Sequence, residues 1–60
     1  MFIKEIELKD NSKYKNVEVN DSEEFEGFLE IKFLKDNIGF KMGSVVLINK
    51  SVVSSIVPEG

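Results

Sequence analysis

Residues 43–58 read GSVVLINKSVVSSIVP and form the densest apolar stretch of the chain. Two runs rich in β-branched residues, 45–48 and 52–57, are separated by a polar triplet at 49–51. β-Branched residues favour strands, and a short polar break between two such runs is typical of a tight turn. The stretch therefore predicts two adjacent strands. Pro58 cannot donate to a sheet ladder, so we expect the second strand to end there and to lie on an edge.

The first third of the chain predicts a β-hairpin. Apolar and charged residues alternate over residues 2–9 (FIKEIELK), and residues 14–19 (YKNVEV) read as the returning strand. Residues 10–12 are a cluster of turn formers, in which Asp and Asn tolerate the left-handed conformation of a tight hairpin. We expect two antiparallel strands with one largely apolar face and with Val17 and Val19 facing the core.

The middle of the chain carries a helix-start pattern. Asp21 is followed three residues later by Glu24, as in a capping box, and acidic residues in a first turn suit the helix dipole. Phe25 is followed by apolar residues at i+3 and i+4, which would form one apolar stripe on a helix. This pattern predicts a helix over residues 22–30.

The same stretch also fits a strand, because apolar residues and Gly27 share one parity through residues 25–33. Residues 38–43, with two glycines, read as a short strand or a turn-rich segment. The capping-box pattern is the more specific signal, so the main prediction is an α+β fold, a small antiparallel sheet with one short helix in the order strand-strand-helix-strand-strand-strand. The alternative is an all-β five-stranded small barrel of the Sm- or SH3-like kind.

The length limits how the fold can be stabilised. The chain has 60 residues, which makes one domain, 1–60, and a domain of this size buries only roughly 60% of the surface of its unfolded chain. Cys and His are both absent, so disulfides and soft-ligand metal sites are excluded. Because 42% of the residues are hydrophobic, the chain can supply an interface as well as a core. We therefore expect a homo-oligomer.

The residue types also limit catalysis. Without His and Cys, only Ser, Lys, Tyr, Asp and Glu could act as nucleophiles or bases, and no pattern brings such residues together. The glutamates within residues 23–30 read as a solvated face, and IGFKMGS at 38–44 lacks the spacing of a phosphate-binding loop. We expect a protein that is not an enzyme and that holds no metal or cofactor.

The charge pattern bears on nucleic acids. The net charge is −3 and every basic residue is Lys, which disfavours non-specific phosphate binding without excluding a local patch. Phe40 beside Lys41 could stack on a base while the ammonium meets a phosphate. The other candidate binding residues are those of the turn, Asn49, Lys50 and Ser51. Among these, Lys50 could point into the pore of a ring-shaped assembly.

The start of the chain, MFIKEIELK, contains no apolar core of a signal peptide, and no apolar run approaches the roughly 20 residues of a membrane helix. We therefore expect a cytoplasmic protein, in the host cell cytoplasm if a phage encodes it, with no membrane partner.

Two resemblances add expectations. DSEEF at residues 21–25 and FKMGSVVLINKSVVSSIVP at residues 40–58 resemble small proteins of Gram-positive bacteria and of their phages and mobile elements. That resemblance implies a small β-rich protein with no agreed activity, and it gives no site residues.

The second resemblance is narrower. LINKSVVSSIVP at residues 47–58 is similar to the closing strands of Sm-like RNA chaperones of the Hfq family, which carry a Lys-His pair in this turn. Lys50 matches the lysine, whereas Ser51 stands where the family has histidine, and Gly27 lies about where a glycine bends the second strand of Sm folds. The resemblance implies ring assembly, with Asn49 and Lys50 contacting RNA.

Together these features predict a non-catalytic interaction protein, encoded by a phage or mobile element, that associates with itself and binds a host or phage protein. An Sm-like RNA-binding ring is the second hypothesis. Sequestration of a small nucleotide-like ligand in a cleft between subunits is the third.

Overall fold

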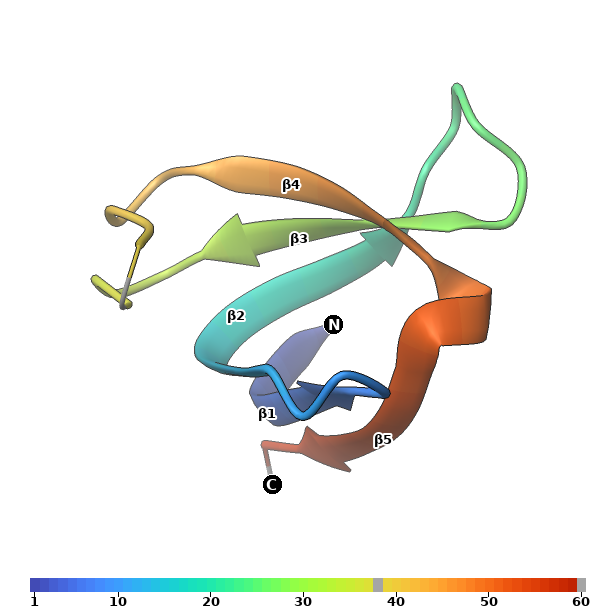
Figure 1. The fold of residues 1–60 in the computed structure, drawn as a ribbon. Helices are drawn as coiled ribbons and strands as arrows, with labels where there is room; N and C mark the ends of the chain where they lie inside the picture. Colours follow the sequence, from blue (N-terminus) through green and yellow to red (C-terminus); the bar gives the residue numbers. More distant parts are fainter. Residues whose placement is uncertain (38, 60) are drawn as a thin grey trace.

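The computed structural model describes residues 1–37 and 39–59, which form a five-stranded antiparallel sheet (Figure 1). The strands are β1 (Phe2–Leu8), β2 (Lys13–Asp21), β3 (Phe28–Phe33), β4 (Val45–Asn49) and β5 (Val53–Pro58). In these two ranges the sole helical element is a 3-10 turn, η1 (Lys50–Val52), and no helix is long or apolar enough to cross a membrane.

The order of the strands in the sheet is β4-β3-β2-β1-β5. The first four strands form a meander, and β5 returns to pair with β1. β4 and β5 are therefore the two edges of the sheet, although η1 joins them directly in sequence. The sheet curls strongly, so that its inner face surrounds the apolar side chains (Figure 1).

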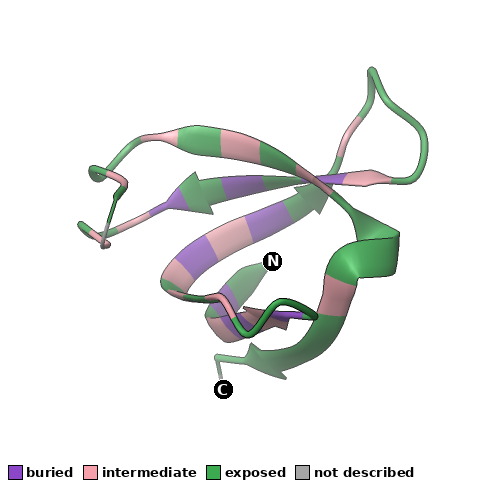
Figure 2. Cartoon of the chain, viewed as in Figure 1, coloured by how far each residue is buried: buried purple, intermediate pink, exposed green. Residues whose placement is uncertain are grey.

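The core comes from the inner faces of β1, β2 and β3. Along β2 and β3 buried residues alternate with more exposed ones, as period-2 side-chain placement requires (Figure 2). Further apolar side chains from β4, β5 and the β3–β4 connection are half-buried against it. The buried set is Ile3, Ile6, Leu8, Val17, Val19, Leu29, Ile31 and Phe33.

The alternation changes phase once within the β1–β2 hairpin. Ile3 lies opposite Val17, and Ile6 lies opposite Tyr14. The two residues on each strand are three positions apart, a spacing that would place them on opposite faces of a regular strand, yet all four pack into the core. Asn16, between the two inward residues of β2, has a φ of 57°, a left-handed conformation that Asn tolerates better than most residues. The irregularity keeps both ends of the hairpin facing inward.

The predicted turn over residues 10–12 is confirmed. Asn11 has a φ of 73°, and the Ser12 backbone N–H donates to Asp10 Oδ1 at 2.9 Å. Hydrogen bonds from the backbone N–H and then the hydroxyl of Ser12 lower the pKa of the Asp10 carboxyl, because both favour its ionised form. The hairpin strands predicted over residues 2–9 and 14–19 are confirmed as well, the second extending to Lys13–Asp21.

The predicted helix over residues 22–30 is wrong, and the α+β prediction is wrong with it. The structure has the five-stranded antiparallel sheet of the all-β alternative. Ser22 does use its hydroxyl like a cap, accepting from Phe25 N–H at 3.1 Å, but the backbone then turns, and Gly27 has a φ of 83°. After this turn the chain enters strand β3.

Burial explains why the strand forms instead. Leu29, Ile31 and Phe33 all reach the core because a strand places every second residue on one face. Burying each such side chain is worth about 1.5–3 kcal/mol, whereas a helix cap contributes about 1 kcal/mol. The summed burial therefore outweighs the local helix signal.

The two C-terminal runs do form strands, but the prediction that they are adjacent is wrong. β4 pairs with β3 and β5 pairs with β1, so the two strands lie at opposite edges of the sheet. β5 ends at Pro58 on an edge, as predicted. Of the segment predicted over residues 38–43, Ile38 lies outside the described residues, and Asn37 and Phe40 form an isolated bridge.

Candidate interaction surface

The β4 edge of the sheet presents backbone groups that no described strand uses. The ladder between β3 and β4 is bracketed by two hydrogen bonds, from Phe33 N–H to Ser44 O and from Lys50 N–H to Gly27 O, both at 2.9 Å. Hydrogen-bonded pairs alternate along an antiparallel ladder, so these two bonds fix its phase. Within residues 44–50, the even-numbered residues face β3 with their backbone groups, and the odd-numbered ones face away from it.

The three outward-facing residues are Val45, Leu47 and Asn49, and we call them the β4 edge. Their side chains also lie on the outer face of the sheet, because Val46 and Ile48 are the β4 residues that pack against the core (Figure 2). Val45 is 57% exposed and Leu47 is 45% exposed. β4 contains no proline and no charged residue, which are the usual devices that protect an edge strand from pairing.

The other edge is better protected. β5 ends in Pro58, which has no N–H to offer a further strand, and its ladder with β1 is interrupted by two register shifts. Ser54 and Ser55 make its middle polar, although Val57 is 43% exposed on it. Of the two edges, β4 is therefore the one open to another strand.

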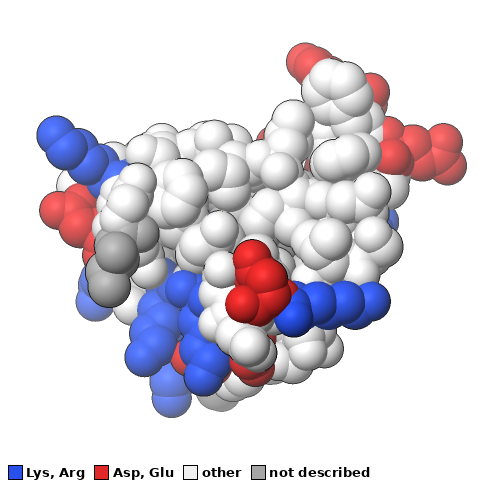
Figure 3. Space-filling view, in the orientation of Figure 1, with Lys and Arg blue, Asp and Glu red and all other residues white. Residues whose placement is uncertain are grey.

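Exposed apolar side chains extend the β4 edge at both ends. Phe28 lies opposite Asn49 in the register, and its ring centroid is 6.2 Å from that of Phe25, which is 50% exposed. Met42, just before β4, is 68% exposed. The upper surface of the molecule, where β4 lies, shows few charged side chains in the space-filling view (Figure 3).

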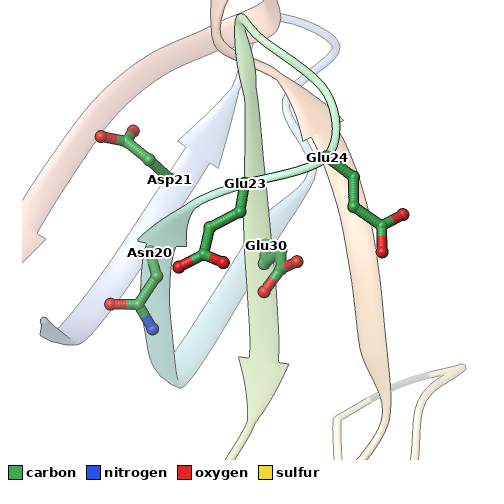
Figure 4. Close-up of a pocket in the computed structure, with 5 residues that line it drawn as sticks. All are labelled: Asn20, Asp21, Glu23, Glu24 and Glu30. Atoms are coloured by element: carbon green, nitrogen blue, oxygen red, sulfur yellow. The ribbon is translucent and has the colours of Figure 1, made fainter.

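Most charged side chains lie away from β4, but two exposed ones, Glu30 and Lys32 of β3, lie directly opposite Leu47 and Val45. Acidic residues surround the β2–β3 loop at the Asn49 end of β4, whereas most basic side chains gather at the lower left of the view, away from β4 (Figure 3). A depression of about 580 Å³ at the acidic end is lined by Asn20, Asp21, Glu23, Glu24 and Glu30. There Asp21 and Glu24 point in opposite directions (Figure 4), and the described residues contain no group of three side chains placed to hold a metal ion.

The predicted binding residues of the turn lie at the acidic end. Asn49 Oδ1 accepts a hydrogen bond from Ser51 N–H at 2.9 Å, so both residues serve to shape η1. The ammonium of Lys50 lies 2.9 Å from Asp21 Oδ1. A lysine paired with a carboxylate beside further glutamates attracts a phosphate weakly, because the neighbouring negative charges repel it.

The other two predicted residues lie at the far end of β4. Phe40 is half-buried, with its ring stacked on Phe33 at a centroid distance of 4.7 Å and edge-on to Tyr14 at 5.7 Å. That packing leaves little of the ring for a base. Lys41 is exposed. The structure thus divides the predicted residues into two groups that β4 separates.

Two features of the surface were not predicted from the sequence. The first is the outward half of the run VVLI, in Val45 and Leu47, because an unbroken apolar run gives no sign of which residues face water. The second is a depression of about 420 Å³ lined by Lys13, Lys15, Asn16, Lys35, Asp36 and Asn37. Its residues come from two distant segments, which the side-chain amide of Asn37 joins through bonds to Lys15 N–H and O, both at 3.2 Å.

Comparison with known proteins identifies no relative of this chain. No protein-family model matches it, and searches of curated proteins and of solved structures found no match. The geometry of the β4 edge is therefore the basis for assigning a function.

Proposed function

We propose that this protein is a non-catalytic interaction protein that binds other polypeptide chains, copies of itself included, by strand addition at the β4 edge. The observation that carries the proposal is the edge itself. Val45, Leu47 and Asn49 direct their backbone groups away from β3, and no proline or charge in β4 blocks the approach of another strand.

Strand addition suits the chemistry of this edge. A strand laid against β4 satisfies the outward N–H and C=O groups, and each hydrogen bond gained contributes a net of about 0.5–1.5 kcal/mol. It also covers the apolar side chains of Val45 and Leu47, as in other complexes formed by β-augmentation. A strand of five residues buries a small area, so we expect reversible rather than permanent binding.

The hypothesis of an Sm-like RNA-binding ring ranks below strand addition. Its support is the position of Lys50 in the exposed turn η1. The ion pair with Asp21 and the neighbouring acidic depression weigh against a phosphate ligand at that turn. No feature of the described residues favours a nucleotide-like ligand.

A peptide that copies β4 tests strand addition directly. We expect a labelled peptide of sequence SVVLINK, residues 44–50, to bind the wild-type protein in a fluorescence anisotropy titration. Leu47→Lys should weaken this binding at least tenfold, because it removes the apolar contact of Leu47 with the added strand and places a charge, a usual barrier to edge pairing, at the centre of β4.

The matched control is Val57→Lys on β5, since Val57 is 43% exposed and Leu47 is 45% exposed. This variant should bind the peptide as the wild type does. Equal losses in the two variants, or no binding by the wild-type protein, would contradict strand addition at β4.

A further inference from the structure

We propose that the strand that pairs with the β4 edge belongs to a second copy of this chain, in an antiparallel dimer whose two-fold axis passes through Leu47. This inference rests on the proposed function and names its partner. The axis stands perpendicular to the sheet, and the two five-stranded sheets become one continuous sheet through β4 and the β4 of the partner copy.

The backbone of β4 is complementary to itself. The three outward-facing residues are evenly spaced, with Leu47 in the middle, so a two-fold axis there pairs Leu47 with its own copy and Val45 with Asn49. All three pairs are of the hydrogen-bonded kind, in which two residues exchange both N–H···O bonds. The outward N–H and C=O groups of Val45 and Leu47 and the N–H of Asn49 are then satisfied, whereas the C=O of Asn49 already accepts the first hydrogen bond of η1. The side chain of Leu47 lies beside its symmetry mate.

The charges at the two ends of β4 favour the antiparallel arrangement. The β2–β3 loop lies beyond the Asn49 end of the strand, and the β3–β4 connection lies beyond the Val45 end (Figure 1). Residues 22–27 carry a net charge of −3 from Glu23, Glu24 and Glu26, and residues 34–44 carry +1 from Lys35 and Lys41 against Asp36. An antiparallel pair brings the acidic loop of each copy to the basic connection of the other.

The exposed apolar residues beyond the two ends of β4 are also brought together by the antiparallel arrangement. Met42 lies at the basic end and Phe25 at the acidic end, and both are among the most exposed apolar residues of the protein. The two-fold axis brings Met42 of one copy toward the end of the other copy that carries Phe25, where a thioether and an aromatic ring pack favourably. A parallel pair would instead place like charges together at each end.

Single cysteines test the axis and the register, because the natural chain has no cysteine. Paired residues on the axis have Cα atoms about 5.5 Å apart, but the Cβ atoms of a hydrogen-bonded pair lie about 5.5 Å apart too, beyond the roughly 3.5–4.5 Å of a disulfide, so a short bismaleimide is used to link the thiols. Leu47→Cys should therefore give a dimer cross-linked by the short bismaleimide, at a yield at least tenfold above that of Val57→Cys on β5. The yields are read from a non-reducing denaturing gel of dilute protein.

The register is tested by two further variants. Val45→Cys and Asn49→Cys should each give little dimer alone, because each cysteine lies four residues, or roughly 13 Å, from its own copy across the axis. Mixed together, they should give the heterodimer in high yield. This pattern of one homodimer and one heterodimer is specific to an axis at Leu47.

Other results separate the dimer from the proposed function. Preferential linkage of Leu47→Cys to Val57→Cys would show head-to-tail pairing of β4 with β5 and overturn the two-fold dimer. Absence of the Leu47→Cys dimer, while the peptide SVVLINK still binds at β4, would overturn the second copy as partner and leave strand addition standing. Absence of both would overturn the dimer and the proposed function together.

Discussion

Replacing Phe33 by alanine is expected to remove at least about a third of the free energy of unfolding at 25 °C. Phe33 is the largest fully buried side chain, and its ring packs against Tyr14 and Phe40 at centroid distances of 5.2 and 4.7 Å. Truncating a buried Phe costs about 3–5 kcal/mol. A chain of 60 residues has a total stability of only about 3–9 kcal/mol, so the loss is comparable with the whole. Urea titration followed by circular dichroism measures it.

Phe40→Ala is the matched control for this variant. Phe40 belongs to the same aromatic cluster but is only half-buried, so part of its surface already faces water in the folded protein. We expect a clearly smaller loss of the free energy of unfolding than for Phe33→Ala. Equal losses for the two phenylalanines would show that the core is not centred on β3.

Proline at two consecutive positions of β4 is expected to lower the stability of the protein by very different amounts. Val46→Pro removes an N–H that faces β3, leaving the Ile31 carbonyl without its donor. It also removes packing of Val46 against the core. Together these losses cost about 3 kcal/mol of stability. Leu47→Pro removes only an outward N–H, which edge strands tolerate, so its cost should be no more than about 1 kcal/mol.

Binding should be affected in the reverse order, with the larger loss in Leu47→Pro. Leu47→Pro is expected to abolish both peptide binding and the concentration-dependent association measured by sedimentation, because the central donor of the β4 edge is gone. Val46→Pro reduces binding only as far as it unfolds the protein. A Leu47→Pro variant as unstable as Val46→Pro would mean that the Leu47 N–H belongs to the β3–β4 ladder and that the β4 edge is not open.

The parts of the fold that could be predicted from the sequence are those where periodicity and burial agree. β1 and β2 were predicted because apolar residues alternate with charged ones and a clear turn cluster lies between them. In residues 22–30 the two signals disagree. The local cap pattern indicated a helix, but only a strand lets Leu29, Ile31 and Phe33 reach one core. The strand is favoured by contacts with core residues that are distant in sequence.

The pairing of strands was harder to predict than their existence. The runs at 45–48 and 52–57 were each identified as strands, yet their proximity in sequence suggested a hairpin. In the structure η1 redirects the chain so that the two runs border β3 and β1. Periodicity shows which face of a strand is buried and carries no information on which strand lies beside it.

The candidate surface depends on that same pairing. An apolar run such as VVLI reads as a fully buried strand, and Val45 and Leu47 become surface residues only because β4 is at an edge. The sequence did identify the neighbouring residues Asn49, Lys50 and Ser51, from their polar character. Their roles in shaping η1 and in pairing with Asp21 required the folded arrangement.

Hydrogen exchange of individual backbone amides, measured by NMR at low and high protein concentration, tests the β4 edge most directly. In dilute protein the amide of Leu47 should exchange fast, while those of Val46 and Ile48, bonded to β3, are protected. At high concentration the Leu47 amide should become protected as well, because a second strand covers it. A Leu47 amide that is protected in dilute protein, or that exchanges fast at every concentration, would contradict an edge that is open and accepts a strand.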